Sequence, residues 1–136
     1  MSTTTDLRAA PAKVIFSGTT HVTAGRDGAA VSRDGFLDIK LPQPHLFGAA
    51  WSTCFLGAVQ LAASQAKVAL PATPEVDAEI DLNHGGGNNF FLSARLNVSV
   101  PGIDRDIAQA LVDAAHEICP YSKATRGNVD VTVTLV

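Results

Sequence analysis

The sequence predicts an α+β fold, and three observations predict it. A mostly apolar run at 45–65 is long enough for one central helix, and alternating, β-branched stretches joined by turns stand both before and after it. A second, amphipathic helix separates the last stretch from the others. Strands grouped in hairpins with helices inserted between them favour α+β over a doubly wound parallel sheet. The predicted order is βββαββαβ, with two central helices packed on antiparallel sheets.

The length of 136 residues suits one domain. We expect a polar N-terminal arm at 1–12 and a single domain over 13–136. The first strand is predicted at 13–24, where β-branched residues roughly alternate with polar ones. The turn Gly25-Arg26-Asp27-Gly28 leads to short strands at 29–32 and 36–41.

The run at 45–65 is hydrophobic on every side, which is typical of a helix in the middle of a protein. Pro42 and Pro44 stand just before it and lack the N–H that a strand ladder needs. Its length approaches that of a membrane span. About half of it is Gly, Ala or Ser, and Gln60 and Gln65 interrupt it. We therefore expect a core helix and no membrane crossing.

The second half of the chain continues the alternation. EVDAEIDL at 75–82 and NFFLSARLNVSV at 89–100 predict a hairpin around the loop at 84–89. Apolar residues at spacings of three and four predict a helix over 105–119, with Asp104 as its N-cap. The apolar stripe expected on this helix consists of Ile107, Leu111, Ala114, Ala115 and Ile118. NVDVTVTLV at 128–136 predicts the closing strand.

Composition excludes several classes of function. The net charge is −3 and no run of Lys or Arg occurs, so we expect no nucleic-acid or membrane-surface partner. MSTTTDLRAA lacks the basic start and apolar run of a signal peptide, so the expected location is cytoplasmic. The four histidines show no metal-ligand spacing, and no metal site is predicted.

The two cysteines are the main candidates for chemistry. Cys54 lies in the first half of the central helix, and Cys119 precedes Pro120, which places Cys119 at a helix end. A single free cysteine is most often buried and inert. Two together can form a redox pair of a peroxidatic and a resolving thiol. A disulfide requires Cα atoms within about 7 Å, which the chain spacing leaves open.

Other candidates have common structural explanations. Arg26 at a turn is usually solvated, although a guanidinium beside a thiolate would stabilise that thiolate. His116 stands three residues before Cys119 and could form a Cys–His pair, but it is more often a satisfied surface histidine. HGGGNN at 84–89 joins two strands and opens no helix, so it fails the test for a phosphate loop.

Three segments resemble one known family. They are AGRDGAAVSRDGFLDIKL, LFGAAWSTCFLGA and the C-terminal run PGIDRDIAQALVDAAHEICPYSKATRGNVDVTVTLV. Together they resemble the OsmC/Ohr family, on its organic hydroperoxide resistance (Ohr) branch, from about residue 13 to the end.

The resemblance implies a thiol-dependent peroxidase that reduces organic, fatty-acid type hydroperoxides to alcohols. Cys54 would be peroxidatic, Cys119 resolving and Arg26 activating, through a Cys54 sulfenic acid and a Cys54–Cys119 disulfide. It further implies an intertwined homodimer with no bound cofactor, reduced by a lipoylated protein. We expect Arg26 and the helix environment to keep Cys54 a thiolate. Apolar side chains are expected to favour organic substrates: Phe36, Phe47, Trp51 and Phe55.

One departure separates the chain from the family pattern. Family members carry a glycine-rich loop and an Asn-Pro-Glu-Gln run before the central helix, whereas LPQPHLF runs straight through here. Pro44 stands where the glutamate that pairs with the arginine would align, which predicts weaker activity. This keeps an alternative function open, a non-catalytic redox-sensing or ligand-binding domain of the same fold.

Overall fold

The computed structural model describes residues 12–23, 29–40 and 43–136. The chain divides into two compact units, Met1–Leu41 and Pro42–Val136, and each is described by itself. The prediction of a single domain over 13–136 stays a prediction.

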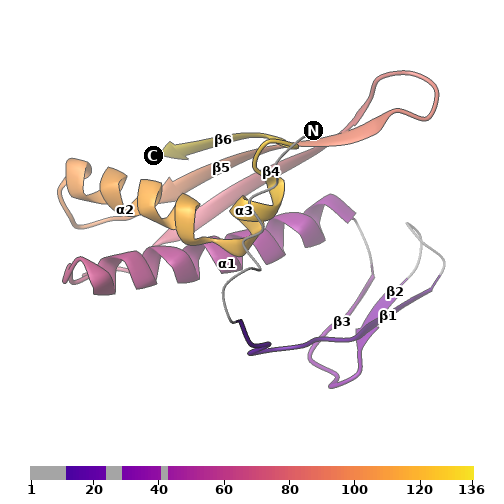
Figure 1. The fold of residues 1–136 in the computed structure, drawn as a ribbon, viewed down its shortest axis with the longest axis horizontal. Coiled ribbons are helices and arrows are strands. Elements are labelled where there is room, and N and C mark those ends of the chain that lie inside the picture. The colour runs from indigo at the N-terminus through magenta and orange to yellow at the C-terminus, as the bar shows by residue number, and fades with distance from the viewer. Residues whose placement is uncertain (1–11, 24–28, 41–42) are drawn as a thin grey trace. The chain divides into compact units, whose positions relative to one another are not determined.

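The first unit contains a three-stranded antiparallel sheet (Figure 1). Its strands are β1 (Thr20–Thr23), β2 (Ala29–Ser32) and β3 (Asp38–Lys40). All three predicted strands are present, but the first does not begin at Lys13. β1 pairs only with the four residues of β2, from Thr20 opposite Ser32 to Thr23 opposite Ala29. The carbonyl of Thr19 still accepts from the N–H of Arg33 at 3.0 Å, but residues 13–18 form no strand pair with any other described residue. Alternation alone therefore does not make a strand.

The second unit holds three helices and three strands (Figure 1). In chain order they are α1 (Gln43–Gln65), β4 (Glu75–His84), β5 (Phe90–Ser99), α2 (Arg105–Ile118), α3 (Pro120–Thr125) and β6 (Asp130–Leu135). The α+β class is therefore confirmed, and the predicted central helix, hairpin and closing strand are all present.

Two details of the predicted order are wrong. First, β6 runs parallel to β5, so the sheet β4-β5-β6 is mixed rather than antiparallel. The chain crosses from β5 to β6 through α2 and α3, and a crossover of that length permits parallel pairing. Second, α3 is an additional short helix. Pro120 ends α2 as expected, but it also occupies the first turn of α3, where a missing N–H costs nothing.

The core lies between α1, α2 and one face of the second sheet. Ala94, Leu96 and Val98 alternate along β5 and are buried. Trp51, Phe55 and Val59 of α1 are fully buried in the same cluster. The run at 45–65 therefore forms a core helix, as predicted.

Gly48 allows α1 to approach the sheet closely. A Cβ at this position would lie 3.4 Å from Cγ1 of Ile80 and 3.5 Å from Cβ of Ala78, both on β4. By length and composition α1 could span a membrane. The packing of α1 against β4 also gives its apolar side chains a place inside the protein.

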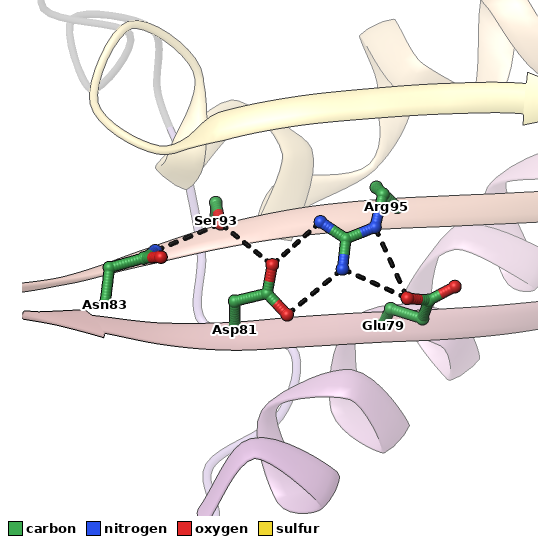
Figure 2. Close-up of polar contacts among 5 residues, drawn as sticks. All are labelled: Glu79, Asp81, Asn83, Ser93 and Arg95. Carbon is green, nitrogen blue, oxygen red and sulfur yellow. Dashed lines mark hydrogen bonds and ion pairs between the residues drawn. The ribbon is translucent and has the colours of Figure 1, made fainter.

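The other face of this sheet is polar (Figure 2). Arg95 on β5 lies opposite Glu79 and diagonal to Asp81, both on β4. Its guanidinium donates to Glu79 at 3.0 Å and to both oxygens of Asp81, at 2.8 and 3.0 Å. Arg95 lowers the pKa of the Asp81 carboxyl and is the main cause of that shift. Ser93 and Asn83 extend the network along the strands.

The second helix confirms its predicted cap and, with the exception of Ile107, its predicted stripe. The Asp104 side chain accepts from the N–H of Asp106 at 2.9 Å. Ile107, predicted on the apolar face, is 44% exposed, whereas Ala108 and Val112 are buried. The buried face thus includes Ala108 and Val112, which pack in the same core cluster as residues of α1 and the sheet.

Candidate active site at the two cysteines

The two cysteines lie side by side although 65 positions separate them in the chain. The Cys119 thiol faces Cys54 with an Sγ–Sγ distance of 3.2 Å, and both thiols are free. Cys54 is partly exposed, whereas Cys119 is fully buried. A disulfide bond is about 2.05 Å long, so the sulfurs need to approach by only about 1 Å to bond.

Cys119 is placed at a corner between two helices. It is both the C-cap of α2 and the N-cap of α3, with extended backbone angles of φ −61° and ψ 121°. Its N–H still donates to the carbonyl of Ala115 at 2.8 Å, and its own carbonyl accepts from Lys123 at 3.0 Å. The following proline disfavours helical angles at Cys119, which confirms the predicted helix end.

Arg126, the C-cap residue of α3, contacts the C-terminal end of α2. Its guanidinium donates to the carbonyl of His116 at 2.6 Å and lies 3.5 Å from the Glu117 carboxylate. A cation at a helix C-terminus is favourable because it meets unpaired carbonyls. This contact steadies the turn that presents Cys119.

The described surroundings of Cys54 raise the pKa of its thiol. Burial is the largest cause, and the neighbouring Cys119 adds to it. A hydrogen bond from the backbone N–H of Tyr121 acts in the opposite direction without overcoming burial. The expectation that the helix environment favours the thiolate is therefore wrong for the described residues. Arg26, the predicted activating cation, lies outside them.

The four predicted apolar site residues have different surroundings. Phe36 belongs to the first unit and is 94% exposed. Trp51 and Phe55 are fully buried and pack in the core. Phe47 is half-buried, stacks edge-on against Trp51 at 5.8 Å between ring centroids, and lines an apolar cavity of about 230 Å³. That these residues contact substrate stays a prediction.

The cavity beside Phe47 is enclosed by α1 and the β4–β5 hairpin. Its lining residues are Pro44, Phe47, Ile80, Leu82 and Leu92. Phe47 and Cys54 are seven residues apart on α1, which is two helical turns, so both point to the same side of the helix. The cavity thus lies on the side of α1 that carries Cys54, although Cys54 is not among its lining residues.

His116 is not the partner of Cys119. It lines a separate groove with Val112 and Asp113 of α2 and Val131 and Val133 of β6, and the groove includes neither cysteine. Its Nδ1 atom is buried without a hydrogen-bond partner in the described part of the chain. Burial, aided by Arg126, lowers the pKa of the imidazole. Residues 12–23, 29–40 and 43–136 also hold no group of three His, Cys, Asp or Glu side chains suited to a metal ion.

Sequence reasoning missed Ser122 and Tyr121. The buried hydroxyl of Ser122 accepts a hydrogen bond from Trp51 Nε1 at 3.2 Å. The only available signal was spacing, because Ser122 follows Cys119 by three residues and Trp51 precedes Cys54 by three. These two equal spacings predict a contact only once it is known that α1 and α3 pack together.

Comparison with known proteins gives consistent relatives. A family described as OsmC-like protein matches residues 41–134. An organic hydroperoxide resistance protein from Xanthomonas axonopodis pv. citri is 40% identical, over 93% of this chain and 99% of its own. The organic hydroperoxide resistance protein OhrB of Bacillus subtilis is 35% identical, over 89% of this chain and 98% of its own.

Solved structures agree with the sequence relatives. The structure of Bacillus subtilis OhrB matches with a TM-score of 0.81 and 34% identity, covering 90% of this chain and all of that one. A Legionella pneumophila organic hydroperoxide resistance protein matches with a TM-score of 0.84 and 30% identity, covering 90% and 98%.

The alignment also bears on chain length. The Xanthomonas alignment spans 141 positions, more than the 136 residues of this chain. The relative therefore has residues without a counterpart in this chain.

Proposed function

Because this chain belongs to the OsmC-like protein family, with relatives named organic hydroperoxide resistance proteins, we propose that it is a thiol peroxidase that reduces organic hydroperoxides. The observation that carries the proposal is the 3.2 Å contact between the free thiols of Cys54 and Cys119. Two thiols at that distance can be oxidised to a disulfide by one peroxide with little movement of the backbone.

The proposed first step is an attack of the Cys54 thiolate on one peroxide oxygen. The O–O bond breaks, Cys54 becomes a sulfenic acid, and the alkoxide takes up a proton to leave as an alcohol. Arg26 is the proposed activating residue, because a guanidinium would offset the effect of burial on the pKa of Cys54. Since no glutamate stands at position 44 to orient Arg26, activity is expected to be weaker than in relatives that carry one.

The second step closes the disulfide. The Cys119 sulfur attacks the sulfenic sulfur of Cys54, the S–OH bond breaks, and the hydroxyl leaves with the thiol proton as water. Both electrons for the peroxide thus come from the two thiols. A dithiol reductant, proposed to be a lipoylated protein, then restores them by thiol–disulfide exchange. A cytoplasmic location suits a site that has to be returned to two thiols.

The apolar cavity beside Phe47 supports the proposed substrate class. Each methylene that leaves water for an apolar site contributes about 0.8 kcal/mol, so a long alkyl tail is favoured over hydrogen peroxide. Phe47 is the proposed contact for that tail, because it is the half-buried aromatic that lines the cavity. Phe36, Trp51 and Phe55 remain further proposed contacts.

Cysteine variants test the proposal. Cys54→Ser is expected to abolish the turnover of cumene hydroperoxide with a dihydrolipoyl reductant, because the nucleophile is gone. Cys119→Ser is expected to allow oxidation of Cys54 to a sulfenic acid that no disulfide then consumes. Mass spectrometry of the oxidised native chain should find Cys54 linked to Cys119. Unchanged turnover in Cys54→Ser would refute the assignment.

The same assay separates the enzyme from a redox sensor or ligand-binding domain. An enzyme consumes hydroperoxide for as long as the reductant lasts, whereas a sensor consumes one equivalent per chain. The absent loop glutamate is what favours this second candidate.

A further inference from the structure

A buried polar contact lies beside the two cysteines. The Trp51 indole N–H donates to the Ser122 hydroxyl at 3.2 Å, and neither residue is exposed to solvent. A buried indole N–H that lost its partner would have no water to replace it, so the bond is a strong constraint on position. Trp51 is on α1 and Ser122 is on α3, 71 positions further along the chain.

This contact joins the same two segments as the cysteine pair. Trp51 precedes Cys54 by three residues on α1, and Ser122 follows Cys119 by three residues. The Trp51–Ser122 contact and the Cys54–Cys119 contact are therefore about one helical turn apart. Tyr121 lies between Cys119 and Ser122 in the chain, and its backbone N–H acts to lower the pKa of the Cys54 thiol. Two neighbouring contacts thus connect segment 119–122 to α1.

The segment needs such support because α3 is short. It has six residues, Pro120–Thr125, and its N-cap Cys119 makes no side-chain capping hydrogen bond. Helices of this length are unstable by themselves and take their position from tertiary contacts. Arg126, the C-cap of α3, makes polar contacts with the end of α2, and the Trp51–Ser122 bond is a polar contact with α1.

We propose that Trp51 and Ser122 are positioning residues, whose hydrogen bond holds the Cys119 sulfur within bonding range of Cys54 for disulfide closure. The proposal rests on the proposed function for its role in turnover. Closure requires an in-line approach of the Cys119 sulfur to the Cys54 sulfur while water leaves from the other side. Rates of such reactions depend steeply on how well the two reacting atoms are held together.

Variants can remove the bond from either side. Ser122→Ala leaves the indole N–H without an acceptor, and Trp51→Phe removes the donor while keeping an aromatic ring in the core. The matched control is Thr125→Val. Thr125 is also buried on α3, but its hydroxyl donates to the carbonyls of Tyr121 and Ser122 within the same helix and not to α1.

The first readout is the effective concentration of Cys119 toward Cys54. It is measured by equilibrating each purified full-length variant with reduced and oxidised glutathione and quantifying the disulfide by mass spectrometry. Ser122→Ala and Trp51→Phe should each lower it by about tenfold, because the sulfurs are no longer held in register. The double variant should lose no more than either single one, and Thr125→Val should match the native chain within about twofold.

The second readout follows the peroxide reaction. After one equivalent of cumene hydroperoxide, dimedone competes with Cys119 for the Cys54 sulfenic acid. The trapped fraction should rise in Ser122→Ala and Trp51→Phe. Because the fraction depends only on competition after the sulfenic acid has formed, slower formation does not affect it.

Two results would overturn the proposal. One is an effective concentration in Ser122→Ala equal to that of the native chain, and the other is an equal loss in Thr125→Val. If the native chain consumes no hydroperoxide, the proposed function fails, and the glutathione equilibrium still decides the role of the Trp51–Ser122 contact.

Discussion

At the scale of the residue, the reactivity of Cys54 depends on groups that act in opposite directions. Burial and the Cys119 thiol raise its pKa, whereas the N–H of Tyr121 lowers it, and burial is the largest effect. Only the thiolate is nucleophilic, so a raised pKa leaves less reactive sulfur at neutral pH. A peroxidatic role therefore demands a further favourable charge, and Arg26 is the residue proposed to supply it.

This assigns a specific pH dependence to Cys54. In a Cys119→Ser background, which leaves a single thiol, Arg26→Ala should slow alkylation of Cys54 by iodoacetamide at pH 7. Without the Arg26 guanidinium, burial still raises the pKa of the Cys54 thiol above 9.0, the ordinary pKa of a cysteine thiol. The alkylation rate should therefore keep rising past pH 9.0. Each unit by which the pKa rises removes about nine-tenths of the thiolate at neutral pH.

Arg26→Lys is the matched control, since it keeps the positive charge and should retain most of the alkylation rate. Superimposable pH profiles for Arg26→Ala and the parent protein would show that Arg26 does not activate Cys54.

At the scale of the element, the turn before α2 determines where this helix begins and hence the position of Cys119 at its other end. Gly102 precedes the N-cap Asp104 and has φ +85°, which favours glycine. A Cβ at Gly102 would also lie 2.6 Å from Cγ of Pro71, in the loop after α1. The turn is therefore restricted both by its backbone angle and by a neighbouring side chain.

Gly102→Ala should destabilise the fold more than Gly127→Ala, as measured by urea unfolding. Both positions have positive φ, but a Cβ at Gly127 meets nothing within 4 Å. Gly127→Ala reports the backbone strain, about 1–3 kcal/mol. Gly102→Ala adds the steric conflict with Pro71, a further cost of about 1–3 kcal/mol.

The contact with Pro71 can be tested separately. Pro71→Ala removes the Cγ atom that the new Cβ would meet. In the Pro71→Ala background, Gly102→Ala should therefore lower the free energy of unfolding only by the backbone strain. Equal destabilisation by the two glycine variants would mean that the Pro71 contact has no energetic consequence.

At the scale of the whole molecule, large apolar side chains remain exposed on the single chain. Leu82, Phe90 and Phe91 are 42%, 55% and 50% exposed near the end of the β4–β5 hairpin, and Leu61 and Ile107 are 46% and 44% exposed on the helices. Several large exposed apolar residues favour association, since their burial against another surface stabilises a complex. An intertwined homodimer is the proposed assembly.

Light scattering coupled to size-exclusion chromatography should therefore give a mass twice the 14.1 kDa of one chain. If the active sites are built across the interface, peroxidase activity per chain should fall on dilution as the dimer dissociates. A mass of one chain at micromolar concentration, with undiminished activity per chain, would contradict the proposed dimer.

Local patterns in the sequence determined most elements of this protein. A mostly apolar run over 45–65 predicted the central helix, alternation predicted the β4–β5 hairpin, and Asp104 and Pro120 marked the two ends of α2. These features depend on neighbours within a few residues, which a sequence displays directly. The resemblance of both cysteine segments to one family added the pairing that spacing left open.

Tertiary structure alone decided the rest, because it concerns residues far apart in the chain. The parallel pairing of β6, the burial of Ala108 rather than Ile107 on α2, and the 3.2 Å approach of Cys54 and Cys119 all depend on how helices and strands pack. So does the bond between Trp51 and Ser122. These arrangements are selected by close packing between residues that are distant in sequence, and no local pattern specifies them.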